Sequence, residues 1–97
     1  MATRDREIDQ LLRAVLSLNN IGEARRFFRD LLTDDELEMI KRRWLVASML
    51  ADGHSYREIE EATGMSSRTV ARIARWIKEG PGGYRLALKR SDAAHHH

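Results

Sequence analysis

The stretch SYREIEEATGMSSRTVARIARWIK, residues 55–78, carries the clearest structural signals in the chain. Ser55 and Glu58 have the spacing of a capping box, which predicts a short helix beginning just after Ser55. Gly64 follows, and glycine takes the left-handed conformation of a tight turn without steric cost. A second amphipathic helix is expected over the remainder of the stretch. Two helices joined by so short a turn are typical of a helix-turn-helix unit.

The second helix of this unit is predicted to begin at a serine cap, Ser66 or Ser67, and to run to about Glu79. The glycine-rich residues 80–83 then stop it. Apolar side chains at helical spacing are expected to hold the two helices at a fixed angle. These are Ile59, Met65, Val70, Ile73 and Ile77.

Arginines occupy the face of this helix opposite its apolar stripe. At about 100° per residue, Arg68, Arg72 and Arg75 fall together on the outward side. Guanidinium groups there suit guanine edges or phosphates, and the free N–H groups of a helix start suit phosphate. An ordinary solvated face is the alternative interpretation. The residues expected to contact DNA are Tyr56, Arg57, Ser66, Ser67, Arg68, Thr69, Arg72, Arg75 and Lys78.

These residues have different expected roles. Arg68, Thr69, Arg72 and Arg75 are expected in the groove, while Ser66, Ser67 and Lys78 hold the backbone. Tyr56 and Arg57 are equally consistent with phosphate contacts and with ordinary surface positions.

Charge is segregated along the chain, although the formal net charge is only +2. Residues 1–65 hold ten Lys/Arg and thirteen Asp/Glu, a balance of −3. Residues 66–90 hold seven basic residues and one acid, a balance of +6, and Asp92 adds −1. A basic block after an acidic body favours binding to a polyanion.

The rest of the chain is also predicted to be helical, which makes the fold class all-α with about five to six helices. A single proline and no sustained alternation of apolar and polar residues argue against strands. One apolar stripe falls in residues 8–16, another in residues 21–32 behind an Asn20 cap, and Thr33 with Glu36 opens a third helix. A short helix over residues 84–90 completes the prediction.

The second half of the third helix is apolar nearly all the way round. Trp44 to Ala51 contains seven apolar residues in eight, so we expect burial on every side. In so small a domain a second copy of the chain is the natural cover, which predicts a homodimer. Trp44 and Trp76 are interpreted as packing residues rather than base-stacking ones.

Length and composition further restrict the kind of protein that the chain can be. Ninety-seven residues suit one small domain, expected over residues 1–90, with dimerisation helices in 1–54 and the helix-turn-helix in 55–79. The histidine run at 95–97 predicts that 91–97 is a purification-tag tail. Absent cysteine excludes disulfides and thiolate zinc sites, and oligomerisation then becomes the source of added stability. No segment has the length of a membrane span, so a cytoplasmic protein is expected, associated with the bacterial nucleoid when it is bound to DNA.

The chain resembles the Trp repressor superfamily, specifically its YerC/YecD-like branch. The motifs that carry the resemblance are residues 31–36, Arg43, Gly53, and residues 55–59 followed by Gly64. The resemblance covers about residues 11–77. It implies an intertwined all-α homodimer whose two recognition helices enter successive major grooves, about 34 Å apart.

The resemblance also bears on a possible effector. Arg43 and Arg72 match the arginines that hold the co-repressor in Trp repressors, and Thr33 matches a pocket-lining threonine. The position after the second arginine is glycine there, whereas Ile73 stands here and would fill the space for the indole ring. Asp34 also replaces a proline. L-tryptophan is therefore predicted not to bind, no other cofactor or metal is predicted, and another anionic effector is left open.

The leading interpretation is a homodimeric, sequence-specific DNA-binding regulator of transcription that acts on double-stranded DNA, with repression favoured. A protein-interaction module that keeps the helix-turn-helix as a scaffold is the alternative. An enzyme has little support, because the chain lacks a cysteine nucleophile and a phosphate loop. His54, the only histidine outside the tail, suits a helix end better than a general base.

Overall fold

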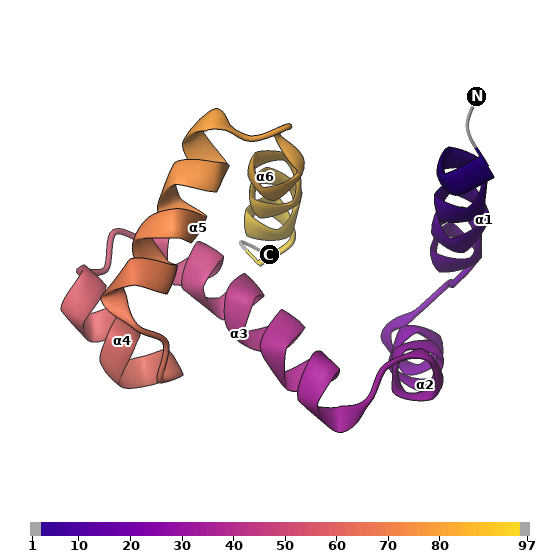
Figure 1. Cartoon of the computed structure of the whole chain (residues 1–97), viewed down its shortest axis with the longest axis horizontal. Coiled ribbons are helices and arrows are strands. Elements are labelled where there is room, and N and C mark those ends of the chain that lie inside the picture. Colours follow the sequence, from indigo (N-terminus) through magenta and orange to yellow (C-terminus); the bar gives the residue numbers. More distant parts are fainter. Residues whose placement is uncertain (1–2, 96–97) are drawn as a thin grey trace. The chain divides into compact units, whose positions relative to one another are not determined.

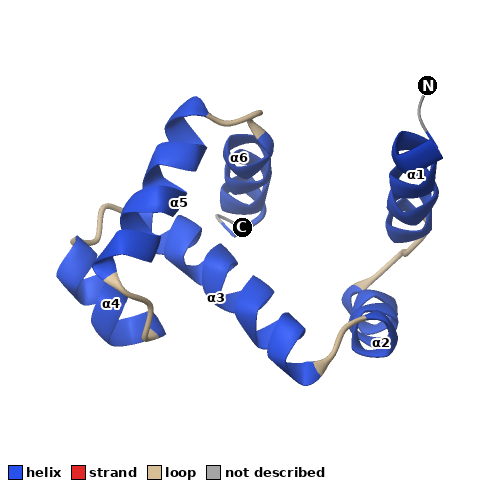
Figure 2. Cartoon of the chain, viewed as in Figure 1, coloured by secondary structure: helices blue, strands red, loops and turns tan. Residues whose placement is uncertain are grey.

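A computed structural model describes residues 3–95, and its side chains are described for residues 5–91. Over the described residues all regular structure is helical and no strand occurs (Figure 2). The six helices, labelled in Figure 1, are α1 (Thr3–Leu16), α2 (Ile21–Leu31), α3 (Asp34–Ala51), α4 (Tyr56–Thr63), α5 (Ser67–Glu79) and α6 (Gly83–His95). The all-α prediction is confirmed.

The helices begin where the sequence predicts caps. The Asn20 side chain accepts a hydrogen bond from the Glu23 N–H at 2.9 Å. Thr33 and Glu36 exchange two hydrogen bonds at the start of α3, at 2.8 and 3.2 Å. Each cap satisfies N–H groups that have no partner inside the helix, so these starts are fixed by local sequence.

The chain divides into two compact units, residues 1–37 and 38–97, and the boundary lies inside α3. The second half of α3 contributes Val46 and Ala47 to the same core as the helix-turn-helix. The C-terminal part of α3 therefore belongs structurally with α4 and α5.

This core is small. Only six apolar residues among those described are buried, and they come from α3, α4, α5 and the turn between α4 and α5: Val46, Ala47, Ile59, Met65, Val70 and Ile73. Ile77, Tyr84 and Leu88 pack against it and are partly buried. The predicted contacts between the helices of the helix-turn-helix are thus present, with α6 added.

Two regions expected to pack are partly exposed within the single chain. The second half of α3 leaves Trp44 and Leu45 36% and 41% exposed, where a second copy is expected to supply the remaining cover. Trp76 is 58% exposed and is not a core residue. Its position on α5 places it on the side of the helix turned away from Val70, so amphipathicity leaves it at the rim.

The last helix is longer than predicted. We expected residues 84–90, with a tail from Ser91, whereas α6 begins at Gly83 and continues to His95. Nothing in the sequence after Arg90 breaks a helix, because the next residues include two alanines and no glycine or proline. Helix α6 lies beside α5 within the C-terminal unit (Figure 1). Residues 96–97 of the predicted tail lie outside the described part.

Candidate nucleic-acid interface

The turn between α4 and α5 sets the geometry of the site. Gly64 has φ +73°, the left-handed conformation predicted for it, and its N–H donates to the Glu60 carbonyl at 2.9 Å. Ser66 then caps α5, with its Oγ accepting from the Thr69 N–H at 3.2 Å. Ser66 is therefore the cap, of the two serines predicted as candidates, and Ser67 is the first residue of the helix.

The start of α4 is equally well defined. Ser55 and Glu58 form a reciprocal capping box, with hydrogen bonds of 2.8 and 3.2 Å. The bond that the Ser55 N–H donates lowers the pKa of Glu58 below its ordinary value, because it stabilises the carboxylate. Thr33 has the same effect on the pKa of Glu36 in the N-terminal unit. Thr33 is exposed and is placed by this cap at the start of α3.

The arginine face of α5 is present as predicted. Arg68, Arg72 and Arg75 are exposed, while Val70 and Ile73 on the opposite side are 0% and 8% exposed. One-sided burial of this kind fixes the rotation of the helix, so the arginines project from the unit. The other predicted contact residues on this unit are exposed as well, apart from the half-buried Thr69: Tyr56, Arg57, Ser66, Ser67 and Lys78.

The arginines differ in their carboxylate partners. Arg75 Nε lies 2.8 Å from Glu79 Oε2, and Arg57 Nε lies 3.6 Å from Glu61 Oε1. All four of these side chains are well exposed, so each pair holds its arginine only weakly and can exchange for a phosphate. Within the described part of the chain, Arg68 and Arg72 lie in no ion pair.

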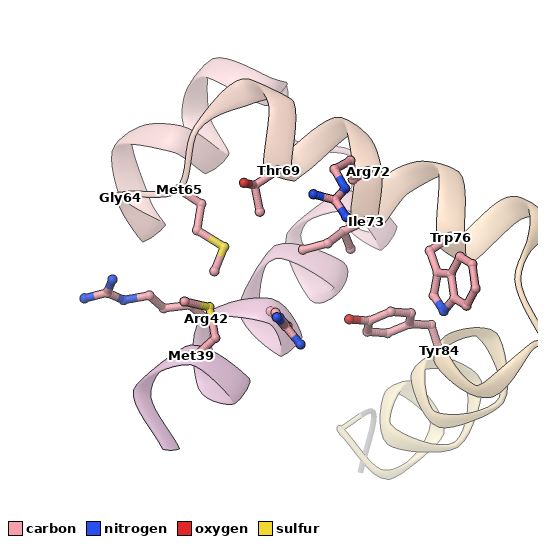
Figure 3. A pocket seen from close by; sticks show the side chains of 10 residues that line it. Met39, Arg42, Gly64, Met65, Thr69, Arg72, Ile73, Trp76 and Tyr84 are labelled. Atoms are coloured by element: carbon pink, nitrogen blue, oxygen red, sulfur yellow. The ribbon is translucent and has the colours of Figure 1, made fainter. Parts of the chain in front are cut away.

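A pocket of ≈ 610 Å³ lies beside the arginine face (Figure 3). Helix α3 contributes Arg42 and Arg43, helix α5 contributes Thr69 and Arg72, and α6 contributes Tyr84. Apolar side chains complete the lining: Met39, Met65, Ile73 and Trp76. Arg43 and Arg72, paired in the sequence analysis as a possible anion clamp, therefore line one cavity.

Several pocket residues were not predicted. Arg42 and Met39 share a face of α3 with Arg43, and Thr69 and Trp76 lie on the flank of α5 between Arg72 and Ile73. Their spacings of three and four residues give a signal that identifies each half of the pocket. No comparable signal identifies Tyr84, because its place depends on how α6 packs. Trp76 and Tyr84 also line a smaller pocket of ≈ 380 Å³ together with Trp44 and Pro81.

No helix in the described part of the chain has the length and hydropathy needed to cross a membrane. No cluster of three or more potential metal ligands occurs among the described residues.

A capped helix-turn-helix with arginines along its second helix, in an all-α chain, defines the class: a helix-turn-helix protein of the kind that regulators use to bind DNA. More particularly, the chain belongs to the Trp repressor protein family, whose sequence model matches residues 6–92. This is a family of DNA-binding regulators and not of enzymes.

Individual relatives agree with this membership. The chain is 41% identical over 87 residues to the uncharacterized protein YerC of Bacillus subtilis, covering 90% of this chain and 84% of YerC. The crystal structure of a TrpR-like protein from Eubacterium eligens matches with a TM-score of 0.84 and 36% identity over 90% of both chains. A protein from Staphylococcus aureus, whose crystal structure is described as that of a candidate Trp repressor, matches with a TM-score of 0.83 and 34% identity, covering 90% of this chain and 87% of that one.

Proposed function

We propose that the protein is a homodimeric, sequence-specific DNA-binding regulator of transcription, and specifically a repressor, with no enzymatic activity. The exposed arginine face of α5 carries the proposal. Arg68, Arg72 and Arg75 project opposite the buried Val70 and Ile73, the arrangement that lets a recognition helix lie in the major groove. Membership of the Trp repressor family supports the same role.

The exposed polar residues around α5 fit contacts with the DNA backbone. Ser66, Ser67 and Lys78 flank the arginine face, and the first N–H groups of α5 can donate to phosphate. Tyr56 and Arg57 stand at the start of α4, where a helix-turn-helix crosses the backbone. In this proposal Arg57 and Arg75 exchange their glutamate partners for phosphates on binding.

The exposed apolar side chains support a homodimer. Helix α2 buries none of its residues within the chain, and α1 leaves Leu11, Leu12 and Leu16 between 42% and 82% exposed. Contiguous apolar surface of this kind is typical of an interface. In the proposed dimer these helices wrap around the partner, and the two copies of α5 lie about 34 Å apart.

L-tryptophan is proposed not to be the effector. Ile73 lines the pocket and is only 8% exposed, so its β-branched side chain serves as core and occupies space that an indole ring requires. The two-arginine arrangement of Arg43 and Arg72 is compatible with a different anion.

Measured DNA binding tests the proposal. A selection of bound sequences from random DNA at stated salt should yield two half-sites one helical turn apart. Replacing Arg72 by alanine should weaken binding to that site by roughly 1–3 kcal/mol if it contacts a base. Arg72→Lys separates the roles, because lysine keeps the charge but loses the bidentate geometry. Arg25→Ala, on α2, is the charge-matched control and should leave affinity unchanged.

Two results would contradict this function. If joint replacement of Arg68, Arg72 and Arg75 by alanine left the affinity for DNA undiminished, α5 would not be the DNA-contacting helix. Partner binding that is insensitive to salt would favour the alternative, a protein-interaction module on a helix-turn-helix scaffold, since DNA binding releases counterions and weakens steeply with salt.

A further inference from the structure

Thr63 is the one buried polar residue in the part of the chain whose side chains the structure describes, with 6% of its surface exposed. It is the last residue of α4 and stands directly before Gly64. Its hydroxyl donates a hydrogen bond to the Ile59 carbonyl at 2.7 Å and accepts one from the Met65 N–H at 3.2 Å. A single side-chain oxygen therefore connects the last turn of α4 to the residue that follows the glycine.

The bond from Met65 stands where a backbone bond is usual. After a left-handed glycine at a helix end, the next N–H commonly donates to a carbonyl of the last helical turn. Here the Glu60 carbonyl accepts from the Gly64 N–H at 2.9 Å, and the Met65 N–H donates to the hydroxyl instead. This N–H has no other partner within the described residues. Without the hydroxyl it would be unpaired in a buried turn, which is unfavourable.

Met65 connects this bond to the core and to α5. Its side chain is 8% exposed and belongs to the same core cluster as Val46 of α3 and Val70 of α5. Figure 3 shows it directed from the turn toward α3. The next residue, Ser66, caps α5. The backbone position of Met65 therefore determines where α5 begins relative to α4.

Contacts to bases depend on the position of α5 more strictly than contacts to phosphates. An arginine that reads guanine forms two parallel hydrogen bonds of fixed geometry. A phosphate contact depends largely on charge, so it tolerates displacement better. A small shift of α5 would therefore weaken base contacts by Arg68 and Arg72 and leave the charge of the helix unchanged.

We propose that Thr63 is a positioning residue for DNA recognition: its hydroxyl closes the turn after α4 and thereby holds α5 in the orientation that base contacts require. Thr63 itself is buried and touches no DNA in this proposal. The effect on recognition rests on the proposed function, whereas closure of the turn by the hydroxyl does not. A threonine that only stabilised the fold would leave the sequence discrimination of the folded protein unchanged.

Thr63→Val tests the effect on recognition, because valine has a similar size and lacks the hydroxyl. Its affinity for the selected DNA site should fall roughly tenfold. Its affinity for unrelated DNA, and the salt dependence of that affinity, should not change, because every Lys and Arg is retained. Thr63→Ser keeps the hydroxyl and should discriminate like the unsubstituted protein. All variants are compared at a temperature at which circular dichroism shows them folded.

Ser48→Ala is the matched control. The Ser48 hydroxyl also donates to the carbonyl four residues earlier, that of Trp44, at 3.0 Å, but it joins no second segment. This variant should therefore keep both DNA affinities. The proposal is wrong if Thr63→Val loses no discrimination, or if Thr63→Ser loses as much. If Thr63→Val does not fold, full discrimination by Thr63→Ser supports the hydroxyl and its loss contradicts it.

Amide hydrogen exchange, followed by NMR without DNA, tests closure of the turn. The Met65 amide should be protected in the unsubstituted protein and in Thr63→Ser, and should exchange roughly tenfold faster in Thr63→Val. The Val70 amide, which donates to the Ser66 carbonyl at 3.0 Å, should keep its protection in all three. An unprotected Met65 amide in the unsubstituted protein would overturn the proposal. If the protein binds no DNA, the proposed function fails, while exchange still decides whether Thr63 closes the turn.

Discussion

Single residues fix the geometry of the helix-turn-helix formed by α4 and α5. Gly64 has φ +73°, and a β-carbon placed there meets nothing within 4 Å. The requirement for glycine is therefore conformational and not steric. Gly80 is the opposite case, since a β-carbon there would clash with the Trp76 carbonyl and press on its indole ring, although φ is ordinary at −79°. Gly64 therefore permits the turn before α5, and Gly80 permits the close backbone contact at the C-terminal end of α5.

Gly64→Ala should lower the free energy of unfolding by about 1–2 kcal/mol, the cost of a left-handed conformation for a residue with a β-carbon. Urea denaturation at fixed protein concentration measures this. Gly83→Ala is the matched control, because Gly83 has open space around it and its φ is not positive. Equal stability of the two variants would show that the turn does not need its left-handed residue.

At the scale of the element, the starts of the helices contain titratable caps. Glu58 in α4 and Glu36 in α3 each accept a backbone hydrogen bond, from Ser55 and Thr33, that lowers the pKa of the glutamate. A carboxylate with a lower pKa in the folded chain stabilises that chain above the ordinary glutamate pKa of about 4.3. This stabilisation is lost as the pH falls through the folded pKa.

Glu58→Gln should therefore reduce the acid sensitivity of the fold. Glutamine can keep the capping-box hydrogen bond but does not titrate. Thermal unfolding measured from neutral pH into the acid range should show a shallower fall in melting temperature for this variant. Glu60→Gln removes the same charge from α4 without touching the cap, and should follow the unsubstituted protein. An unchanged pH profile for Glu58→Gln would contradict the role of the cap.

The whole molecule has more apolar surface than its own core can cover. Six described apolar residues are buried, whereas thirteen large apolar side chains are at least 36% exposed. Those on α1 recur at helical spacing, and the proposed dimer would bury them. A second copy would add stability to a small core that has no disulfides.

Leu12→Glu should weaken self-association, because Leu12 on α1 is 49% exposed within the chain and the proposed dimer covers it. A buried leucine contributes roughly 1.5–3 kcal/mol, so the dissociation constant should rise by roughly tenfold or more. Sedimentation over a range of concentrations measures it. Gln10→Glu adds the same charge to the same helix at an exposed polar position and should leave the dimer intact. A monomeric unsubstituted protein would refute the homodimer.

Much of the fold was predictable from the sequence because its signals are local. The caps at Asn20, Thr33 and Ser55 and the turn at Gly64 depend on residues within four positions of one another, and all are confirmed. The apolar stripe of α5 likewise predicted which residues are buried and which arginines are exposed. The length of α6 was wrong because the histidine run was interpreted as part of a tail, although no residue there stops a helix.

The helices, their starts and the arginine face of α5 follow from the amino-acid sequence alone, since periodicity and capping act over one or two turns. The resemblance to Trp repressors already paired Arg43 with Arg72, whereas it is the packing of the helices that brings Tyr84 of α6 to the same cavity and leaves Trp76 at its border instead of in the core. Those positions depend on how helices distant in the chain pack around Val46 and Val70. Packing between helices depends on many weak contacts between distant residues, so it cannot be predicted from a short sequence motif.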